Sequence, residues 1–303
     1  MFCKKAFLRI DLMRMDRIRI ILLSTVLLAS TALAADFSGV SAMKFTRDAV
    51  AFGPRPAGSE ANQKLQAYIL SQIRQDGCQV MEDPFTAKTP VGDKTMDNII
   101  CKFPGTSGRA IAITGHFDTK LSPGRKFVGA NDGGSSTGLL LELARSLSRK
   151  PRIDDIYVVW FDGEEAFRQE WAGVDNLYGS RHLAEKWRKD QTLTRLKALI
   201  NVDMIGDKSL DIKRETNSNP RLLRLVWETA AELGYQAYFI NENLATDDDH
   251  MPFVQLGVPA LDIIDFDYPP WHEDSDTLDK LSAQSLEVVG TVVADVIHRL
   301  EIQ

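Results

Sequence analysis

The sequence predicts a single α/β domain in which a central mixed, mostly parallel β-sheet is covered by helices on both faces. The composition, 44% hydrophobic and 26% charged over 303 residues, is that of an ordinary globular protein. No internal repeat, low-complexity tract or long linker divides the chain. In its second half strand-like and helical runs alternate, which favours crossover connections and parallel strands with helices on both sides.

The first 34 residues have the features of a secretory signal peptide. Basic residues precede an uncharged, largely apolar run over 20–33, which ends in Ala32-Leu33-Ala34, the small-x-small pattern that signal peptidases cleave. The run is shorter than the roughly 20 residues of a membrane helix, although an N-terminal anchor is the alternative. We expect a folded domain over 35–303, periplasmic or secreted, without stable membrane association after cleavage.

Removing this segment makes the chain more acidic and leaves two of its cysteines. The formal net charge changes from −6 to −10, which argues against nucleic acid as a partner because such proteins normally carry a basic excess. Cys78 and Cys101 would enter an oxidising compartment, each in a strand-like stretch with a turn-rich segment between them. They either form a disulfide or stay as two buried thiols, because sequence does not show the Cβ geometry that a disulfide needs.

The first half of the domain is predicted to begin with two helices, over 41–52 and 59–75. The segment 53–58 separates them, since its two prolines and two glycines forbid a continuous helix. Strand-like runs follow over 78–85, 98–103 and 109–115. We expect early antiparallel pairing at one edge of the sheet.

The second half alternates between the two element types. Apolar spacing predicts helices over 137–147, 177–187, 220–233 and 282–300. Buried strands are predicted over 155–161, 198–202 and 258–264. Pro220 stands in the first turn of its helix, where the missing N–H leaves no bond unmade.

Histidines and carboxylates gather where these strands end, and ligands of such sheets bind beyond the carboxyl ends of the strands. The residues concerned are His116, Asp118, Asp132, Asp162, Glu164, Glu165, Asp203, Asp262 and His272. Two imidazoles with several carboxylates suit Zn²⁺ better than Ca²⁺ or Mg²⁺, and the lack of nearby thiols favours a catalytic over a structural zinc.

Two pairs in this set have distinct expected roles. Asp118, two residues beyond His116 on an extended chain, lies on the same side and is expected to orient that imidazole. Glu164 and Glu165 diverge in a turn, so one can bind metal while the other carries protons, with a pKa raised by neighbouring carboxylates.

The run 134–138 also fits the Gly-x-Ser-x-Gly pattern of serine hydrolases, with Asp203 and His272 in the order of a triad. No strong strand directly precedes Ser136, which lies at a predicted helix start. We therefore expect Ser136 to be a helix cap and not a nucleophile.

These runs, in this order, resemble the M28 family of zinc aminopeptidases and, within it, the glutaminyl-peptide cyclotransferases. The resemblance covers nearly all of 35–303, from Phe52-Gly53-Pro54-Arg55-Pro56-Ala57-Gly58-Ser59 to the closing helix, and implies the zinc-aminopeptidase (phosphorylase/hydrolase-like) fold. Glu164 matches the catalytic glutamate. The implied metal ligands are Asp132, Glu165 and His272, and a second metal position in the two-zinc aminopeptidases would be completed by His116 and Asp203.

Narrower motifs favour the cyclotransferase branch. They are the run 161–167 followed by Trp171, the runs 175–184 and 248–253, and the pair Trp271-His272. By this resemblance, Asp203 and Asp248 share a hydrogen-bonded network with the catalytic glutamate. Trp171, Trp271 and Tyr268 are expected to contact the substrate.

The sequence departs from the animal cyclotransferases at several positions. Asp262 replaces a histidine, Asp247 replaces a glutamine, and one more residue separates Phe167 from Trp171. The run 131–138 is more similar to the aminopeptidase version. These departures bear on the polarity of the pocket and on the number of zinc ions.

We therefore predict a zinc-dependent glutaminyl cyclase that converts the N-terminal glutamine of peptides to pyroglutamate and releases ammonia. Its partners would be peptides or proteins with a free N-terminus. The alternative is an M28 aminopeptidase that hydrolyses N-terminal residues, and a remote one is a zinc-containing binding protein without catalysis, against which the presence of Glu164 argues. We expect one zinc ion for a cyclase and two for an aminopeptidase.

Overall fold

Residues 37–148, 151–168, 171 and 173–303 are described by the computed structural model of the chain, and they belong to one unit, Phe37–Gln303. The predicted signal peptide over 1–34 lies outside the described residues. Within the ranges given above, no helix combines the length and the apolar character needed to span a membrane.

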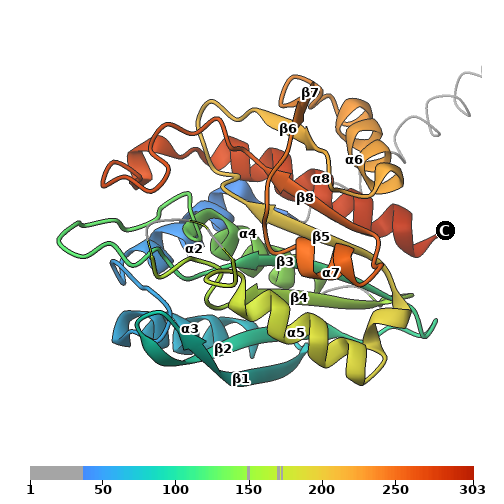
Figure 1. Ribbon diagram of the computed structural model, residues 1–303. Coiled ribbons are helices and arrows are strands. Elements are labelled where there is room, and N and C mark those ends of the chain that lie inside the picture. Colours follow the sequence, from blue (N-terminus) through green and yellow to red (C-terminus); the bar gives the residue numbers. More distant parts are fainter. Residues whose placement is uncertain (1–36, 149–150, 169–170, 172) are drawn as a thin grey trace, which may run out of the picture. The chain divides into compact units, whose positions relative to one another are not determined.

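A six-stranded sheet runs through this unit in the order β1-β2-β4-β3-β5-β8 (Figure 1). The strands are β1 (Gln79–Thr89), β2 (Gly92–Phe103), β3 (Ala110–His116), β4 (Asp155–Phe161), β5 (Leu196–Asp203) and β8 (Ala260–Ile264). β1 and β4 pair antiparallel with β2, whereas the pairs β3–β4, β3–β5 and β5–β8 are parallel. The carboxyl ends of β3, β4, β5 and β8 therefore lie along the same edge.

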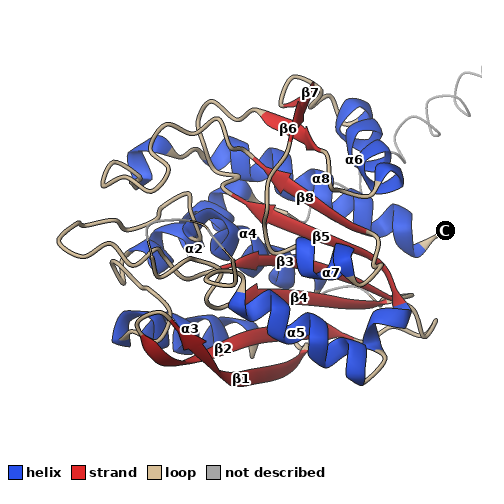
Figure 2. Ribbon diagram, in the orientation of Figure 1, coloured by secondary structure: helices blue, strands red, loops and turns tan. Residues whose placement is uncertain are grey.

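Helices cover both faces of the sheet, with α5 and α7 in front and α4 and α8 behind in Figure 2. One apolar cluster joins the sheet to α2 (Gly39–Val50), α3 (Glu60–Ile73), α4 (Gly134–Leu147), α6 (Pro220–Glu232) and α8 (Ala283–Glu301). A second cluster joins the opposite face to α5 (Tyr178–Lys189) and α7 (Met251–Gln255). In the central strands β3 and β4, alternate residues enter the two clusters, as the strand period of two requires. The predicted fold class is confirmed.

The predicted helices and strands of the domain are all present, and their bounds differ most in the β1–β2 hairpin. There the strands continue past the predicted runs to Thr89 and Gly92, which pair across the turn. Their exposed polar residues hide the strand pattern. The sequence did not predict α7, the short pair β6 (Ile212–Glu215) and β7 (Phe239–Leu244), which form a separate two-stranded parallel sheet, or the single 3₁₀ turns Thr192–Arg195 and Leu278–Lys280.

Cys78 and Cys101 form a disulfide, with their Cα atoms 5.5 Å apart. It lies at the end of the β1–β2 ladder, where Val80 is the partner of Cys101. Of the two alternatives that the sequence left open, the structure therefore has the disulfide.

Glycine allows α2 and α4 to pack with their backbones in contact. A Cβ atom at Gly138 in α4 would lie 2.1 Å from Oγ1 of Thr46 and 2.6 Å from the carbonyl oxygen of Ala42, both in α2. Gly133, with φ of 76°, turns the chain into α4. α4 is thereby fixed directly behind the loop that carries Asp132.

Candidate active site

The parallel strands bring the predicted site residues to one edge of the sheet. His116 ends β3, Asp203 ends β5, and Glu164 and Glu165 follow β4. A cavity of about 270 Å³ opens at this edge. Its lining is made mostly of acidic and aromatic side chains, among them Asp132, Glu164, Glu165, Asp203, Asp248, Trp171, Phe266 and Trp271.

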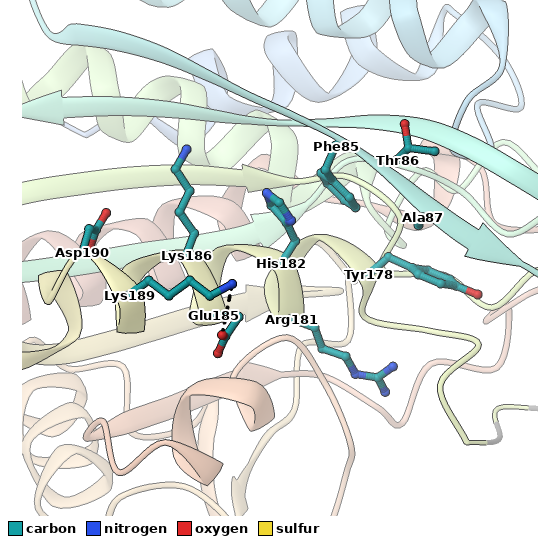
Figure 3. Close-up of a pocket in the computed structure, with 10 residues that line it drawn as sticks. All are labelled: Phe85, Thr86, Ala87, Tyr178, Arg181, His182, Glu185, Lys186, Lys189 and Asp190. Carbon is teal, nitrogen blue, oxygen red and sulfur yellow. Dashed lines mark ion pairs between the residues drawn. The ribbon is translucent and has the colours of Figure 1, made fainter.

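A larger cavity, of about 730 Å³, lies between β1 and α5 (Figure 3). There the ring of His182 stacks on Phe85, with centroids 4.3 Å apart, and Lys189 pairs with Glu185. Neither group of metal-binding side chains found in the described residues lies in it. The smaller cavity, which does contain such side chains, is therefore the candidate active site.

His116, Asp132 and Asp203 form one group that could hold a metal ion, with ligand atoms all within 4.8 Å of one another. Nε2 of His116 lies 3.1 Å from Oδ1 of Asp203 and 3.3 Å from Oδ1 of Asp132. All three side chains are buried.

Asp132, Glu165 and His272 form a second group of this kind. Nε2 of His272 lies 3.1 Å from Oε1 of Glu165 and 3.4 Å from Oδ2 of Asp132. Asp132 therefore presents one oxygen to each group. A carboxylate shared between two neighbouring positions is an arrangement that can serve either one metal ion or two.

The donor atoms in these groups fit a cation. In the described part of the chain, Oδ2 of Asp132 and Oε2 of Glu165 are buried without a hydrogen-bond partner. Buried polar atoms normally have such a partner, so these oxygens are suited to binding a metal ion. The set consists of imidazole nitrogens and carboxylate oxygens without a thiol, which fits a catalytic zinc site.

The backbone is left-handed at two places in the site. His272 has φ of 56°, and Met204, directly after Asp203, has φ of 47°. Residues other than glycine seldom adopt this conformation, and where they do, the strain is often found at functional sites. Each of the two metal-binding groups thus has such a residue at or next to one of its ligands.

Asp118 contacts both the turn that carries Glu164 and Glu165 and the imidazole of His116. Its carboxylate accepts hydrogen bonds from the backbone N–H groups of Glu164 at 3.0 Å and Glu165 at 3.3 Å. Its Oδ1 lies 3.6 Å from Nδ1 of His116, on the side of the imidazole that the sequence predicts. Asp118 therefore also fixes the turn that separates the two glutamates, a role that the sequence did not indicate.

Asp276 holds the loop of Asp132 in the same way. It accepts hydrogen bonds from the backbone N–H groups of Asn131 at 2.9 Å and Asp132 at 3.2 Å, and from the hydroxyl of Tyr268 at 2.7 Å. The sequence did not indicate this role for Asp276. Tyr268, expected to contact substrate, is not among the residues that line the cavity, and its buried hydroxyl donates to Asp276 instead.

Arg55, from the Pro/Gly-rich segment 53–58, stabilises the backbone that follows β3 and the backbone that precedes Asp132. Its buried guanidinium donates to the carbonyl oxygens of Phe117 and Gly129, each at 2.8 Å, and of Val128. Burial lowers the pKa of Arg55 to about 10 although nearby acids such as Asp132 raise it, so the side chain stays charged at neutral pH. This buried cation partly offsets the acids of the site.

Glu164 is the acid next to the metal-binding groups that belongs to neither of them. Burial raises its pKa, and Glu165 and Asp248 add to this, although His116 acts against it, so that the pKa lies well above its usual range. Oε2 of Glu164 lies 3.8 Å from Nδ1 of His116. The pKa of His116 is raised too, since Glu164 and Asp203 outweigh the effect of burial. Each of the two groups therefore holds a proton more tightly than it would in water.

Three more acids, Asp248, Asp249 and Asp262, are buried near the site. Burial, with the charge of Asp203, raises the pKa of Asp248 to about 6, and burial also raises the pKa of Asp249. Asp262 accepts a hydrogen bond from Asn201 at 3.2 Å, and its Oδ2 lies 3.9 Å from Nδ1 of His250. Asp249 was not singled out from the sequence, although it directly follows Asp248.

The aromatic side chains and Ser136 complete the comparison with the predicted site. Trp171 and Trp271 both line the cavity, and the Trp271 ring stacks on His272 with centroids 4.2 Å apart. Phe266, which the sequence did not single out, lies 4.8 Å from Trp271 by ring centroids. Ser136 lies inside the first turn of α4 and donates to the carbonyl oxygen of His116, so it is neither the predicted helix cap nor a nucleophile.

The fold and the site define an α/β protein with metal-binding side chains at the carboxyl ends of parallel strands. The model of peptidase family M28 matches residues 98–297. The chain belongs to this family, which confirms the predicted resemblance.

The chain is similar both to glutaminyl cyclases and to a leucine aminopeptidase precursor. The glutaminyl-peptide cyclotransferase of Gloydius blomhoffii is 30% identical, over 79% of this chain and 75% of the relative. Among solved structures, an Acidobacteriales bacterium glutaminyl cyclase is 41% identical with a TM-score of 0.85, covering 88% of this chain and 96% of that one. A leucine aminopeptidase precursor from Bacteroides thetaiotaomicron is 26% identical with a TM-score of 0.78, covering 88% and 98%.

Proposed function

We propose that this protein is a zinc-dependent glutaminyl-peptide cyclotransferase, which closes the N-terminal glutamine of a peptide to pyroglutamate and releases ammonia. The observation that carries the proposal is a small aromatic cavity with the buried acid Glu164 beside the group Asp132, Glu165 and His272. Glutaminyl cyclases among the relatives, at 30% and 41% identity, support it.

Asp132, Glu165 and His272 would hold the zinc ion, and zinc bound there would polarise the side-chain carbonyl of the substrate glutamine. Although burial raises the pKa of Glu165, His272 lowers it below its usual range, so that this carboxylate is in the ionised form that a metal ligand needs. Lys120 adds to this, with Nζ 3.6 Å from Oε2 of Glu165.

Glu164 would carry the proton in this reaction. It takes a proton from the α-amine while the amine nitrogen attacks the side-chain carbonyl carbon, so that a C–N bond forms within the substrate. It then gives that proton to the amide nitrogen, whose bond to the carbon breaks as ammonia leaves. A carboxyl group with a raised pKa suits both steps near neutral pH. Asp203 and Asp248 would keep the proton network around Glu164 in place.

The walls of the cavity would favour ring closure over hydrolysis. Trp171 and Trp271 would lie against the glutamine side chain and keep bulk water from it. Because the attacking amine belongs to the substrate itself, correct positioning supplies much of the acceleration.

Aminopeptidase activity is the second candidate, and the group His116, Asp132 and Asp203 favours it. His116, Asp132 and Asp203 would hold a second metal ion, which would supply an activated water for hydrolysis, and Glu164 would be the base. The leucine aminopeptidase precursor among the solved structures agrees with this alternative.

An extracytoplasmic location is part of the proposal. The leader-like sequence over 1–34 supports it, and so does the disulfide between Cys78 and Cys101, because disulfides persist mainly in oxidising compartments. N-terminal sequencing of protein recovered from the producing cells should give Ala35 as the first residue.

Two peptides would distinguish the activities. Purified protein with bound zinc is incubated with a Gln-initiated and a Leu-initiated peptide of otherwise equal sequence, and products are read by mass spectrometry. We expect pyroglutamate and ammonia from the first and no free leucine from the second. Free leucine without pyroglutamate would contradict the cyclase proposal, and about two zinc ions per chain in elemental analysis would favour the aminopeptidase.

A further inference from the structure

We propose that Asp247 makes this enzyme prefer peptides with lysine or arginine in the two residues that follow the N-terminal glutamine. The inference rests on the proposed function, because it concerns the part of the peptide that leaves the cavity. It assigns a specificity-determining role to a carboxylate that takes no part in the reaction itself.

Asp247 differs from the other acids of the cavity by its exposure. Asp132, Glu164 and Glu165 are at most 6% exposed, and Asp203 and Asp248 are buried as well. Of the described residues that line the cavity, Asp247 is the only exposed acid. Trp271, 39% exposed, also reaches the surface there. Asp247 therefore lies at the mouth, where a bound peptide passes after its first residue.

The charge of Asp247 is not neutralised within the protein. Among the described residues, its carboxylate has neither a hydrogen-bond nor an ion-pair partner. Exposed acids of nearby segments do have one: Glu242 shares Lys213 with Asp267, at 3.2 and 2.5 Å. A cationic side chain of the substrate can therefore pair with Asp247 without displacing an internal partner.

The backbone at Asp247 is held on both sides. The N–H of Thr246 donates to the buried Glu215 at 3.4 Å, and Asn217 donates to the carbonyl oxygen of Thr246 at 3.1 Å. On the other side, the carbonyl oxygen of Asp248 accepts from the N–H of Met251 at 2.8 Å. A carboxylate on a fixed backbone loses less conformational entropy when it pairs with a ligand.

The sign of the preference follows from where the charges lie. Zinc bound in the cavity would offset the buried acids, whereas Asp247 stands at the mouth with its charge uncompensated. It attracts a cation and repels an acid in the following residues. An exposed pair of this kind changes kcat/KM by roughly two- to fivefold.

The test uses the full zinc-loaded enzyme and the amidated peptides Gln-Lys-Lys-Phe, Gln-Ala-Ala-Phe and Gln-Glu-Glu-Phe. We expect kcat/KM to fall in that order through KM, and the ratio between the first and third to shrink at high salt, since salt screens exposed charges. Asp247→Asn should bring the ratio close to one, and Asp247→Lys should invert it. Asp93→Asn is the matched control, an exposed acid in the β1–β2 hairpin outside the cavity, and it should keep the wild-type ratio.

Two failures can be told apart. If the wild-type enzyme makes pyroglutamate from all three peptides at equal kcat/KM, or if Asp247→Asn keeps the wild-type ratio, the role of Asp247 is overturned while the proposed function stands. If no peptide yields pyroglutamate, the proposed function fails, and the inference fails with it.

Discussion

Glu164 is a carboxylic acid at a position where its ionised form is costly. Burial and the surrounding acids raise its pKa, while His116 beside it favours the charged form. Neither metal-binding group includes it. Its position and its pKa are therefore those of a group that takes up and returns a proton during the reaction.

Replacing Glu164 tests this role directly. Glu164→Gln keeps the size of the side chain but removes the proton carrier, so kcat should fall about a hundred- to ten-thousandfold. Zinc content should stay at the wild-type level, because Glu164 belongs to neither metal-binding group. Ammonia release measures the first quantity and elemental analysis the second. Wild-type turnover would show that Glu164 does not carry the proton.

Asp118 should act on metal affinity through the residues that it holds. Asp118→Asn keeps the shape but turns one acceptor into a donor that faces the N–H of Glu164 or Glu165. We expect zinc affinity to fall about ten- to a hundredfold, as for other residues that orient metal ligands. Competition with a chelator of known affinity measures it, and an unchanged zinc Kd would contradict the role.

At the scale of elements, the contact between α2 and α4 fixes the position of the Asp132 loop. The apolar spacing predicts both helices but not how closely they pack. An exposed glycine replaced by alanine stabilises a helix by about 1 kcal/mol. At Gly138 atoms of α2 already occupy the space that a Cβ atom would need. Replacing Gly138 by alanine should therefore destabilise the protein instead of stabilising it.

Gly138→Ala is expected to lower the free energy of unfolding by about 1–3 kcal/mol, the usual cost of overpacking. The added methyl group meets Oγ1 of Thr46 and the carbonyl oxygen of Ala42. Urea denaturation measures the change. The double variant Gly138→Ala/Thr46→Ala removes only the side-chain clash, so it should still be destabilised. A double variant as stable as Thr46→Ala alone would show that the backbone contact does not limit packing.

The elements that sequence predicts well are the long ones with a clear apolar period. β4 was predicted with its observed bounds because it is buried on both faces. β6 and β7 were missed because they are short and pair outside the main sheet. The role of Asp276 was missed because it depends on a contact with Asn131, 145 positions earlier in the chain, which no local pattern records.

The site was predicted in a similar way. Strand ends and the family resemblance named the two metal-binding groups, and the structure brings their members together. Tyr268 was expected to contact substrate, whereas its hydroxyl is bound to Asp276. Side-chain direction after an irregular segment such as the one following β8 depends on tertiary contacts, so sequence did not determine it.

Across the whole molecule, stability should depend on pH through acids that folding buries. Asp76, in the turn that follows α3, has its pKa raised to about 6 by burial, although the charge of Arg145 acts in the opposite direction. The folded form thus holds this proton more tightly than the unfolded chain does. The resulting destabilisation is absent below about pH 4 and complete above about pH 6.

Asp76→Asn should remove that penalty. After allowance for the partial exposure of Asp76, the variant should be more stable than the wild type by about 1 kcal/mol at pH 8 and equally stable at pH 4. Urea denaturation at both pH values measures the difference. The same difference at both values would contradict the assignment.

The order in which the chain is synthesised limits when the site can form. Asp276 holds the Asp132 loop from 145 positions away, and Glu165 meets His272 across 107 positions. A growing chain that has passed Asp203 already has every member of the first metal-binding group, whereas the second must wait for residues 272–276 to leave the ribosome. The second group therefore needs a nearly complete chain before its members can come together.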